Sequence, residues 1–211
     1  MALCSVSGAC SRSGKTALLE TLLRALPERR AAAVKFTTTD DVFERCPRGT
    51  PCVVCDIDVP FRIVTDPATL GAPGTDTDRL ARAGAARVVW AIARQGAAAA
   101  AWAQVERMIG GAALAVMEGS TIVALANPDL RVFVAHPFLS PRRWKPTSPP
   151  LIAASDLVVV NLPEAGGRPP SAEVMAALRA HRPQDDVVIA DVTRPLAQWA
   201  PALRARLAGW S

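Results

Sequence analysis

The first 26 residues constrain the fold of this chain more than any other stretch. A short apolar run, Ala2 to Val6, predicts a buried strand, and a loop of small residues follows it. Gly14-Lys15-Thr16 then opens an amphipathic helix whose leucines recur on one side: Leu18, Leu19, Leu22, Leu23 and Leu26. A strand, a glycine-containing loop and a helix in this order are the structural context of a phosphate-binding loop.

The residue types in this loop suit the phosphates of a nucleotide. Backbone N–H groups and the positive end of the helix attract anions, Lys15 is expected to reach the β- and γ-phosphates, and the Thr16 hydroxyl to bind Mg²⁺. The usual first glycine of the pattern is Ala9 here. The alternative is an ordinary helix N-terminus that happens to read Gly-Lys-Thr. The predicted nucleotide contacts in the loop are Ser11, Arg12, Ser13, Gly14, Lys15, Thr16 and Ala17.

Two later strands are each followed by a carboxylate that suits the same site. The strand predicted over Ala31 to Phe36 leads to Asp40 and Asp41, where open α/β sheets bind ligands. Asp40 or Asp41 is expected to hold Mg²⁺ through water or to orient an attacking water; the alternative is a loop with a helix N-cap. The strand predicted over Ala112 to Met117 ends in Glu118, the Walker B position beside Mg²⁺. Lys15, Asp40 and Glu118 are therefore the predicted catalytic residues.

The stretch from 43 to 60 holds three cysteines within ten residues: Cys46, Cys52 and Cys55. Clustered cysteines in a cytosolic chain favour metal or redox chemistry over structural disulfides. Zn²⁺ or an iron–sulfur cluster would each need four ligands. Cys10 in the phosphate loop is the candidate fourth ligand, and a second subunit's cysteine, Asp56 or Asp58 are the alternatives. The remaining alternative is a set of free thiols in a loop.

The rest of the chain alternates between strands and helices. Strands are predicted over Phe61 to Val64, Arg87 to Ala93, Arg131 to Ala135, Leu157 to Val160 and Val187 to Ala190. Helices are predicted over Asp78 to Ala83, Ala97 to Ile109, Ser171 to His181 and Pro195 to Leu207. This rhythm predicts an α/β fold in three layers, with a mostly parallel sheet flanked by helices. We expect a single P-loop domain over residues 1–211, with the cysteine loop at 43–60 as an insertion.

Two further segments carry candidate binding residues. The loop from His136 to Pro150 contains Arg142, Arg143 and Lys145, whose charges can meet an anionic substrate or serve only as a solvated connection. Asn161 and Glu164 follow a late strand and weakly match the guanine-reading motif Asn-Lys-x-Asp, so Asn161 is a candidate nucleobase contact.

The composition of the chain bears on whether membranes or nucleic acids are among its binding partners. No apolar run reaches the roughly 18 residues of a membrane helix, and the N-terminus lacks the basic region of a signal peptide, so a cytoplasmic location without a membrane partner is expected. The net charge is +5, but the basic residues are scattered and only three of the 24 are lysines. Nucleic-acid binding is therefore not indicated.

Four motifs occur in a recognisable order: ACSRSGKT over residues 9–16, Val34-Lys35-x-Thr37-x-x-Asp40, Gly74-x-Asp76-x-x-Arg79, and Met117-Glu118-Gly119. In this order they resemble the molybdopterin-guanine dinucleotide biosynthesis protein B family, P-loop GTPases of the group that includes metal-insertion GTPases. The resemblance covers about residues 2–125. It implies that Lys15 and Thr16 bind phosphate and Mg²⁺, that Asp40 lies in a switch-like loop, and that Glu118 is the Walker B acid. The cysteine insertion departs from the family pattern, as does Thr-Thr-Thr in place of a histidine-rich stretch.

Two functions fit these features. The first is slow, partner-dependent hydrolysis of a nucleotide by a homodimeric accessory protein for metal-cofactor maturation. GTP is the expected nucleotide, and ATP is the alternative. Its client would be a cofactor-biosynthesis protein or a metalloenzyme. The alternative is a P-loop kinase or ATP-dependent ligase acting on a small anion, with the loop around Arg142 to Lys145 binding substrate. A metal-binding regulator that has lost hydrolysis is a third possibility.

Overall fold

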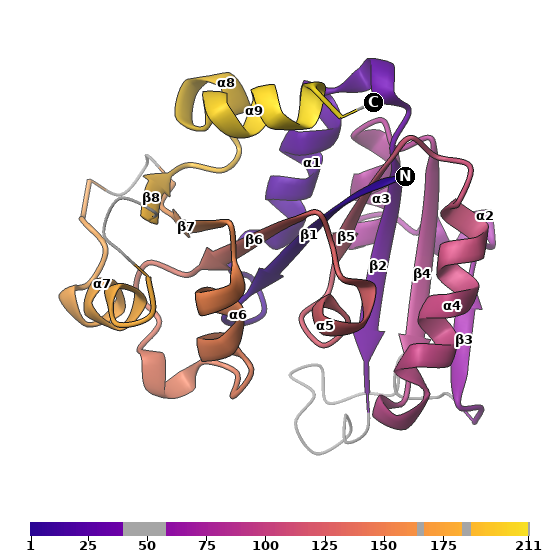
Figure 1. Cartoon of the computed structure of the whole chain (residues 1–211), viewed down its shortest axis with the longest axis horizontal. Helices are drawn as coiled ribbons and strands as arrows, with labels where there is room; N and C mark the ends of the chain where they lie inside the picture. Colours follow the sequence, from indigo (N-terminus) through magenta and orange to yellow (C-terminus); the bar gives the residue numbers. More distant parts are fainter. Residues whose placement is uncertain (40–57, 164–166, 183–186, 211) are drawn as a thin grey trace.

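The computed structural model describes residues 1–39, 58–163, 167–182 and 187–210 (Figure 1). The strands in these ranges form one sheet. The sheet has eight strands in the order β3-β4-β2-β5-β1-β6-β7-β8. Every neighbouring pair is parallel except β3 with β4, which is antiparallel at the edge. The strands are β1 (Ala2–Gly8), β2 (Ala32–Thr38), β3 (Phe61–Val64), β4 (Arg87–Ala93), β5 (Leu114–Glu118), β6 (Leu130–Ala135), β7 (Leu157–Asn161) and β8 (Val187–Ala190). The predicted mostly parallel α/β sheet is confirmed.

Helices and short helical turns connect these strands. The helices are α1 (Lys15–Ala25), α2 (Pro67–Leu70), α3 (Asp76–Arg82), α4 (Ala98–Ile109), α5 (Val123–Ala126), α6 (Ser148–Ala154), α7 (Ala172–Arg179), α8 (Leu196–Trp199) and α9 (Pro201–Ala208). The described residues also contain the 3₁₀ turns η1 (Pro27–Arg29), η2 (Gln95–Ala97) and η3 (Pro141–Arg143).

The two faces of the sheet bury separate apolar clusters, which makes the fold three-layered. On one face Cys4, Val6 and Val116 pack with α1, α3, α8 and α9. On the other face Leu3 and Met117 pack with α4, and Ile152 of α6 lies in a third cluster with strands β6 and β7. Successive residues of a strand point to opposite faces, so central strands covered on both sides are mostly apolar along their length. This explains why short apolar runs predicted the strands correctly.

Two predicted segments differ from the structure because of proline. The helix predicted over 195–207 is two helices, since Pro201 cannot continue the hydrogen bonding of α8 and instead begins α9. The loop predicted over 136–150 ends early, because α6 begins at Ser148 with Pro149 and Pro150 in its first turn. Proline is tolerated there because the N–H groups of a first turn have no partner within the helix.

The parallel strands at the centre of the sheet all end at the edge formed by their carboxyl ends, which is not the lateral edge where β3 lies. The loop after β1 leads into α1, β5 ends at Glu118, and β2 carries Lys35 to the same edge. Binding sites in open α/β folds form at this edge. Within the described ranges no helix is both long and apolar enough to cross a membrane.

Candidate functional site

The loop between β1 and α1 has the close backbone packing of a phosphate-binding loop. Gly14 has φ +106°, a value that favours glycine, and a Cβ there would lie 2.3 Å from Asn161 Nδ2. A Cβ on Gly8 would lie 2.6 Å from Ser13 Oγ. Ala9, which stands at the usual first glycine, is buried. The close approach that the pattern requires is therefore made at Gly8 and Gly14.

Lys15 points back over the loop that it follows. Its Nζ donates to the carbonyl oxygen of Cys10 at 2.8 Å and lies 3.9 Å from Glu118 Oε1. The side chains of Lys15 and Glu118 are only 10% and 13% exposed. An ammonium held this way, beside backbone N–H groups at a helix N-terminus, is placed to meet an anion.

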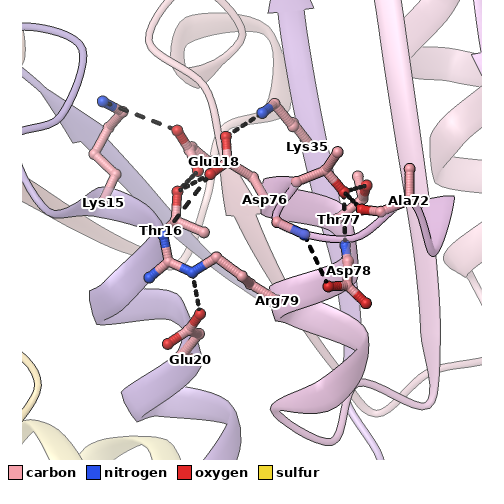
Figure 2. Close-up of polar contacts among 12 residues, drawn as sticks. Lys15, Thr16, Glu20, Lys35, Ala72, Asp76, Thr77, Asp78, Arg79 and Glu118 are labelled. Atoms are coloured by element: carbon pink, nitrogen blue, oxygen red, sulfur yellow. Dashed lines mark hydrogen bonds and ion pairs between the residues drawn. The ribbon is translucent and has the colours of Figure 1, made fainter. Parts of the chain in front are cut away.

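Three oxygen atoms converge beside this lysine (Figure 2). Thr16 Oγ1 lies 2.8 Å from Glu118 Oε2 and 3.2 Å from Asp76 Oδ1. A hydroxyl has one proton, so it can donate a full hydrogen bond to only one of the two carboxylates. Oxygen donors, carboxylates in particular, are the ligands that Mg²⁺ prefers. The residues present therefore fit a Mg²⁺ ion bound by Thr16 and one or both carboxylates.

Asp76 also connects this oxygen cluster to two cations. Lys35 Nζ forms an ion pair with Asp76 Oδ2, and Arg79 Nη1 lies 4.0 Å from Asp76 Oδ1. Arg79 Nε in turn donates to Glu20 Oε1 at 2.6 Å, which ties α3 to α1. Burial alone would raise the pKa of Asp76, but the hydrogen bond and charge of Lys35, with Thr16 and Arg79, outweigh burial and hold the pKa below the ordinary value of an aspartate. Asp76 is thus held as a carboxylate.

Thr16, Asp76 and Glu118 line a cavity of about 720 Å³ at the carboxyl ends of the central strands. Every lysine of the chain, Lys15, Lys35 and Lys145, lies along its wall. Most of the predicted nucleotide contacts also line this cavity: Ser11, Arg12, Gly14, Thr16 and Ala17. Ser13, in the same loop, is buried and does not line it. The cavity thus collects positive charge around one oxygen cluster, an arrangement suited to a polyanion bound with a metal ion.

Asn161 lies against the phosphate loop. Its Nδ2 donates to the carbonyl oxygen of Ser13 at 3.2 Å, and its Oδ1 accepts from the N–H of Val192 at 3.3 Å. Both ends of the amide therefore connect the loop to the segment after β8. The predicted nucleobase contact by Asn161 stays a prediction, and a brace of the loop is the role that this geometry supports.

Several predicted site residues lie outside the described residues. These are Asp40, Asp41, Glu164 and the three clustered cysteines, Cys46, Cys52 and Cys55. Cys10, their predicted partner, is half-buried; burial raises the pKa of its thiol, while the charges of Lys15, Lys145 and Arg143 act in the opposite direction. Among the described residues no group of three or more His, Cys, Asp or Glu side chains is placed to hold a metal ion. The cysteine metal site therefore stays a prediction.

The sequence did not single out Asp76 or Lys35 as site residues, whereas Lys145 was a candidate for binding an anion and does line the cavity. Asp76 reaches the cavity because Thr75 caps α3, accepting from the N–H of Asp78, and leaves Asp76 in the first turn. The signal in the sequence was the motif Gly74-x-Asp76-x-x-Arg79. For Lys35 it was the scarcity of lysine in an arginine-rich chain.

The structure is a three-layer α/β fold like that of P-loop proteins, with a glycine-containing loop between β1 and α1, a carboxylate at the end of the neighbouring strand β5, and a cation-lined cavity. No protein-family model matches the sequence, and a search of curated proteins finds no similar chain. The resemblance to molybdopterin-guanine dinucleotide biosynthesis protein B therefore rests on the motifs alone.

Proposed function

We propose that this protein binds a nucleoside triphosphate with Mg²⁺ and hydrolyses it slowly. The observation that carries the proposal is the convergence of Glu118, Asp76 and the Thr16 hydroxyl next to Lys15. When bound, Mg²⁺ would neutralise charge on the β- and γ-phosphates. Lys15 would contact the same phosphates, and the N–H groups at the start of α1 would hold them in place.

The proposed role of hydrolysis is to drive the maturation of a metal cofactor, with GTP as the expected nucleotide. The support is the motif resemblance together with the cysteine stretch in the same chain. A homodimer would let cysteines of two chains share one metal, either Zn²⁺ or an iron–sulfur cluster. The expected client is a cofactor-biosynthesis protein or a metalloenzyme.

A kinase or ligase acting on a small anion is the second candidate function. The observation in its favour is the extension of the cavity past the phosphate loop to Lys35, Thr37 and Arg79. Cations beyond the phosphate loop can hold an acceptor as well as the nucleotide. Such an enzyme would prefer ATP and would turn over faster when its acceptor is present.

Turnover of GTP and ATP by Lys15→Ala tests hydrolysis. The proposal expects the activity of the unmodified protein to be lost, because the phosphates lose their main side-chain cation. Arg24→Ala is the matched control, since its side chain is 58% exposed on the same helix. Unchanged turnover in Lys15→Ala would sink the assignment of the loop.

Metal analysis of protein purified without air tests the maturation role. The unmodified protein is expected to hold stoichiometric zinc or iron, and a variant lacking Cys46, Cys52 and Cys55 to lose it. An absence of metal in both proteins would remove the support for maturation and favour the kinase.

A further inference from the structure

Lys145 lies beside the phosphate loop, although it belongs to the segment between β6 and α6. Its backbone N–H donates to the carbonyl oxygen of Ala9 at 3.0 Å, which fastens this segment to the start of the loop. The sheet order places β6 directly next to β1, on the side opposite β5. The loop is thus flanked by Glu118 after one neighbouring strand and by Lys145 after the other.

The segment is held in this position by further contacts. The Trp144 indole N–H donates to the carbonyl oxygen of Leu139 at 3.1 Å, and the N–H of Ser148 donates to the carbonyl oxygen of Lys145 at 2.8 Å. Lys145 therefore lies between a braced turn and the first residue of α6. A cation on such a support reaches a ligand with little loss of backbone freedom.

Of the three basic residues in this segment only Lys145 lines the cavity; Arg142 and Arg143 do not. No carboxylate of the described residues forms an ion pair with the Lys145 ammonium. Lys145 is exposed at the wall of this cavity. Partial desolvation beside the loop and, after it, the charge of Lys15 lower the pKa of Lys145, while Glu118 and Cys10 act in the opposite direction. Two neighbouring ammonium groups repel each other until an anion lies between them.

We propose that Lys145 contacts the terminal phosphate of the bound nucleotide, as a second lysine supplied by the chain itself. Lys15 is placed for the β- and γ-phosphates. Lys145 lines the same cavity, and its backbone is bound to Ala9 at the start of the same loop. Charge develops on the terminal phosphoryl group during its transfer, so a cation there stabilises the transition state. This role rests on the proposed nucleotide site and applies to hydrolysis and to transfer onto an acceptor alike.

The affinities for a non-hydrolysable triphosphate and for the diphosphate, both measured with Mg²⁺, test this contact. Lys145→Met is expected to weaken triphosphate binding by about tenfold or more, the usual effect of losing a charged hydrogen bond, while diphosphate binding changes by less than about twofold. Lys145→Arg keeps the charge and is expected to restore most of the preference for triphosphate. Arg142→Met, an exposed neighbour outside the cavity, is the matched control and should behave as the unmodified protein.

The outcomes separate this contact from the proposed function. A triphosphate preference unchanged in Lys145→Met, or an equal loss for both nucleotides, would overturn the contact while leaving the nucleotide site in place. An unmodified protein that binds neither nucleotide would overturn both. Lys145→Gln, which keeps a long polar side chain, replaces Lys145→Met if that variant does not fold.

Discussion

The hydroxyl of Thr16 lies 2.8 Å from the Glu118 carboxylate, although 102 residues separate them in the chain. The contact exists because β1 and β5 are parallel neighbours, with Val6 paired to Glu118. The end of β5 is therefore beside the loop that β1 enters. This relationship turns two separate motifs into one site.

Replacing Thr16 tests the proposed role of its oxygen. Thr16→Ala removes one of the proposed Mg²⁺ ligands, so triphosphate binding should need a Mg²⁺ concentration at least about tenfold higher. Thr16→Ser keeps the oxygen and should need about the same concentration as the unmodified protein. A titration of Mg²⁺ at fixed nucleotide measures this. Equal Mg²⁺ dependence in Thr16→Ala would contradict metal binding by Thr16.

Replacing Gly14 tests the geometry of the loop. Gly14→Ala combines a strained φ with a contact on Asn161, so it should lower the free energy of unfolding by about 1–3 kcal/mol and weaken nucleotide binding. Gly96→Ala is the matched control, because a Cβ at that exposed position meets no atom within 4 Å. Urea unfolding of both variants gives the difference. Equal stability of the two would show that the loop accepts a Cβ at Gly14.

The charge of Asp76 makes a pH-dependent contribution to stability. Its pKa in the folded protein is lowered from the ordinary value of an aspartate, so the ionised carboxylate stabilises the fold at any pH above that ordinary value, and the effect is lost as the pH falls through the lowered pKa. Asp76→Asn should therefore destabilise more at about pH 6 than at about pH 3, by about 1 kcal/mol or less for a partly exposed pair. Urea unfolding at both pH values measures this. In the background of Lys35→Met the pH-dependent difference should shrink; an unchanged difference would mean that Lys35 does not hold the carboxylate.

A brace and a nucleobase contact at Asn161 have different consequences. Asn161→Ala removes hydrogen bonds to Ser13 and Val192 and should lower the free energy of unfolding by about 1–2 kcal/mol. It should weaken GTP and ATP binding equally, because both amide atoms already have backbone partners. Affinities for the two nucleotides decide the matter, and a loss confined to GTP would show that Asn161 reads the base.

The sequence predicted the parts of the site that are local in the chain. The loop around Lys15 and the strand ending in Glu118 could be recognised because phosphate binding and buried parallel strands leave short, continuous patterns. Asp76 and Lys35 could not be assigned in this way. They meet only because α3 packs beside β2 and β4, and no spacing in the sequence encodes that contact.

Proline explains the two segments of the fold in which the prediction from sequence differs from the structure. Pro201 was included in a continuous helix, whereas the structure begins a new helix there. Pro149 and Pro150 suggested a loop, yet proline fits the first turn of α6. In both places proline lies in the first turn of a helix, α9 at Pro201 and α6 at Pro149 and Pro150.

Amide hydrogen exchange with a bound non-hydrolysable GTP analogue and Mg²⁺ tests the central claim most directly, because it locates the nucleotide without altering the protein. The account predicts slower exchange in peptides covering residues 9–17 and 118–121, where backbone and side chains surround the cavity. A second cavity of about 650 Å³, lined by Leu162, Ile189 and Trp199 among others, provides the contrast. Protection confined to that cavity, or no protection at all, would contradict a nucleotide bound at the loop between β1 and α1.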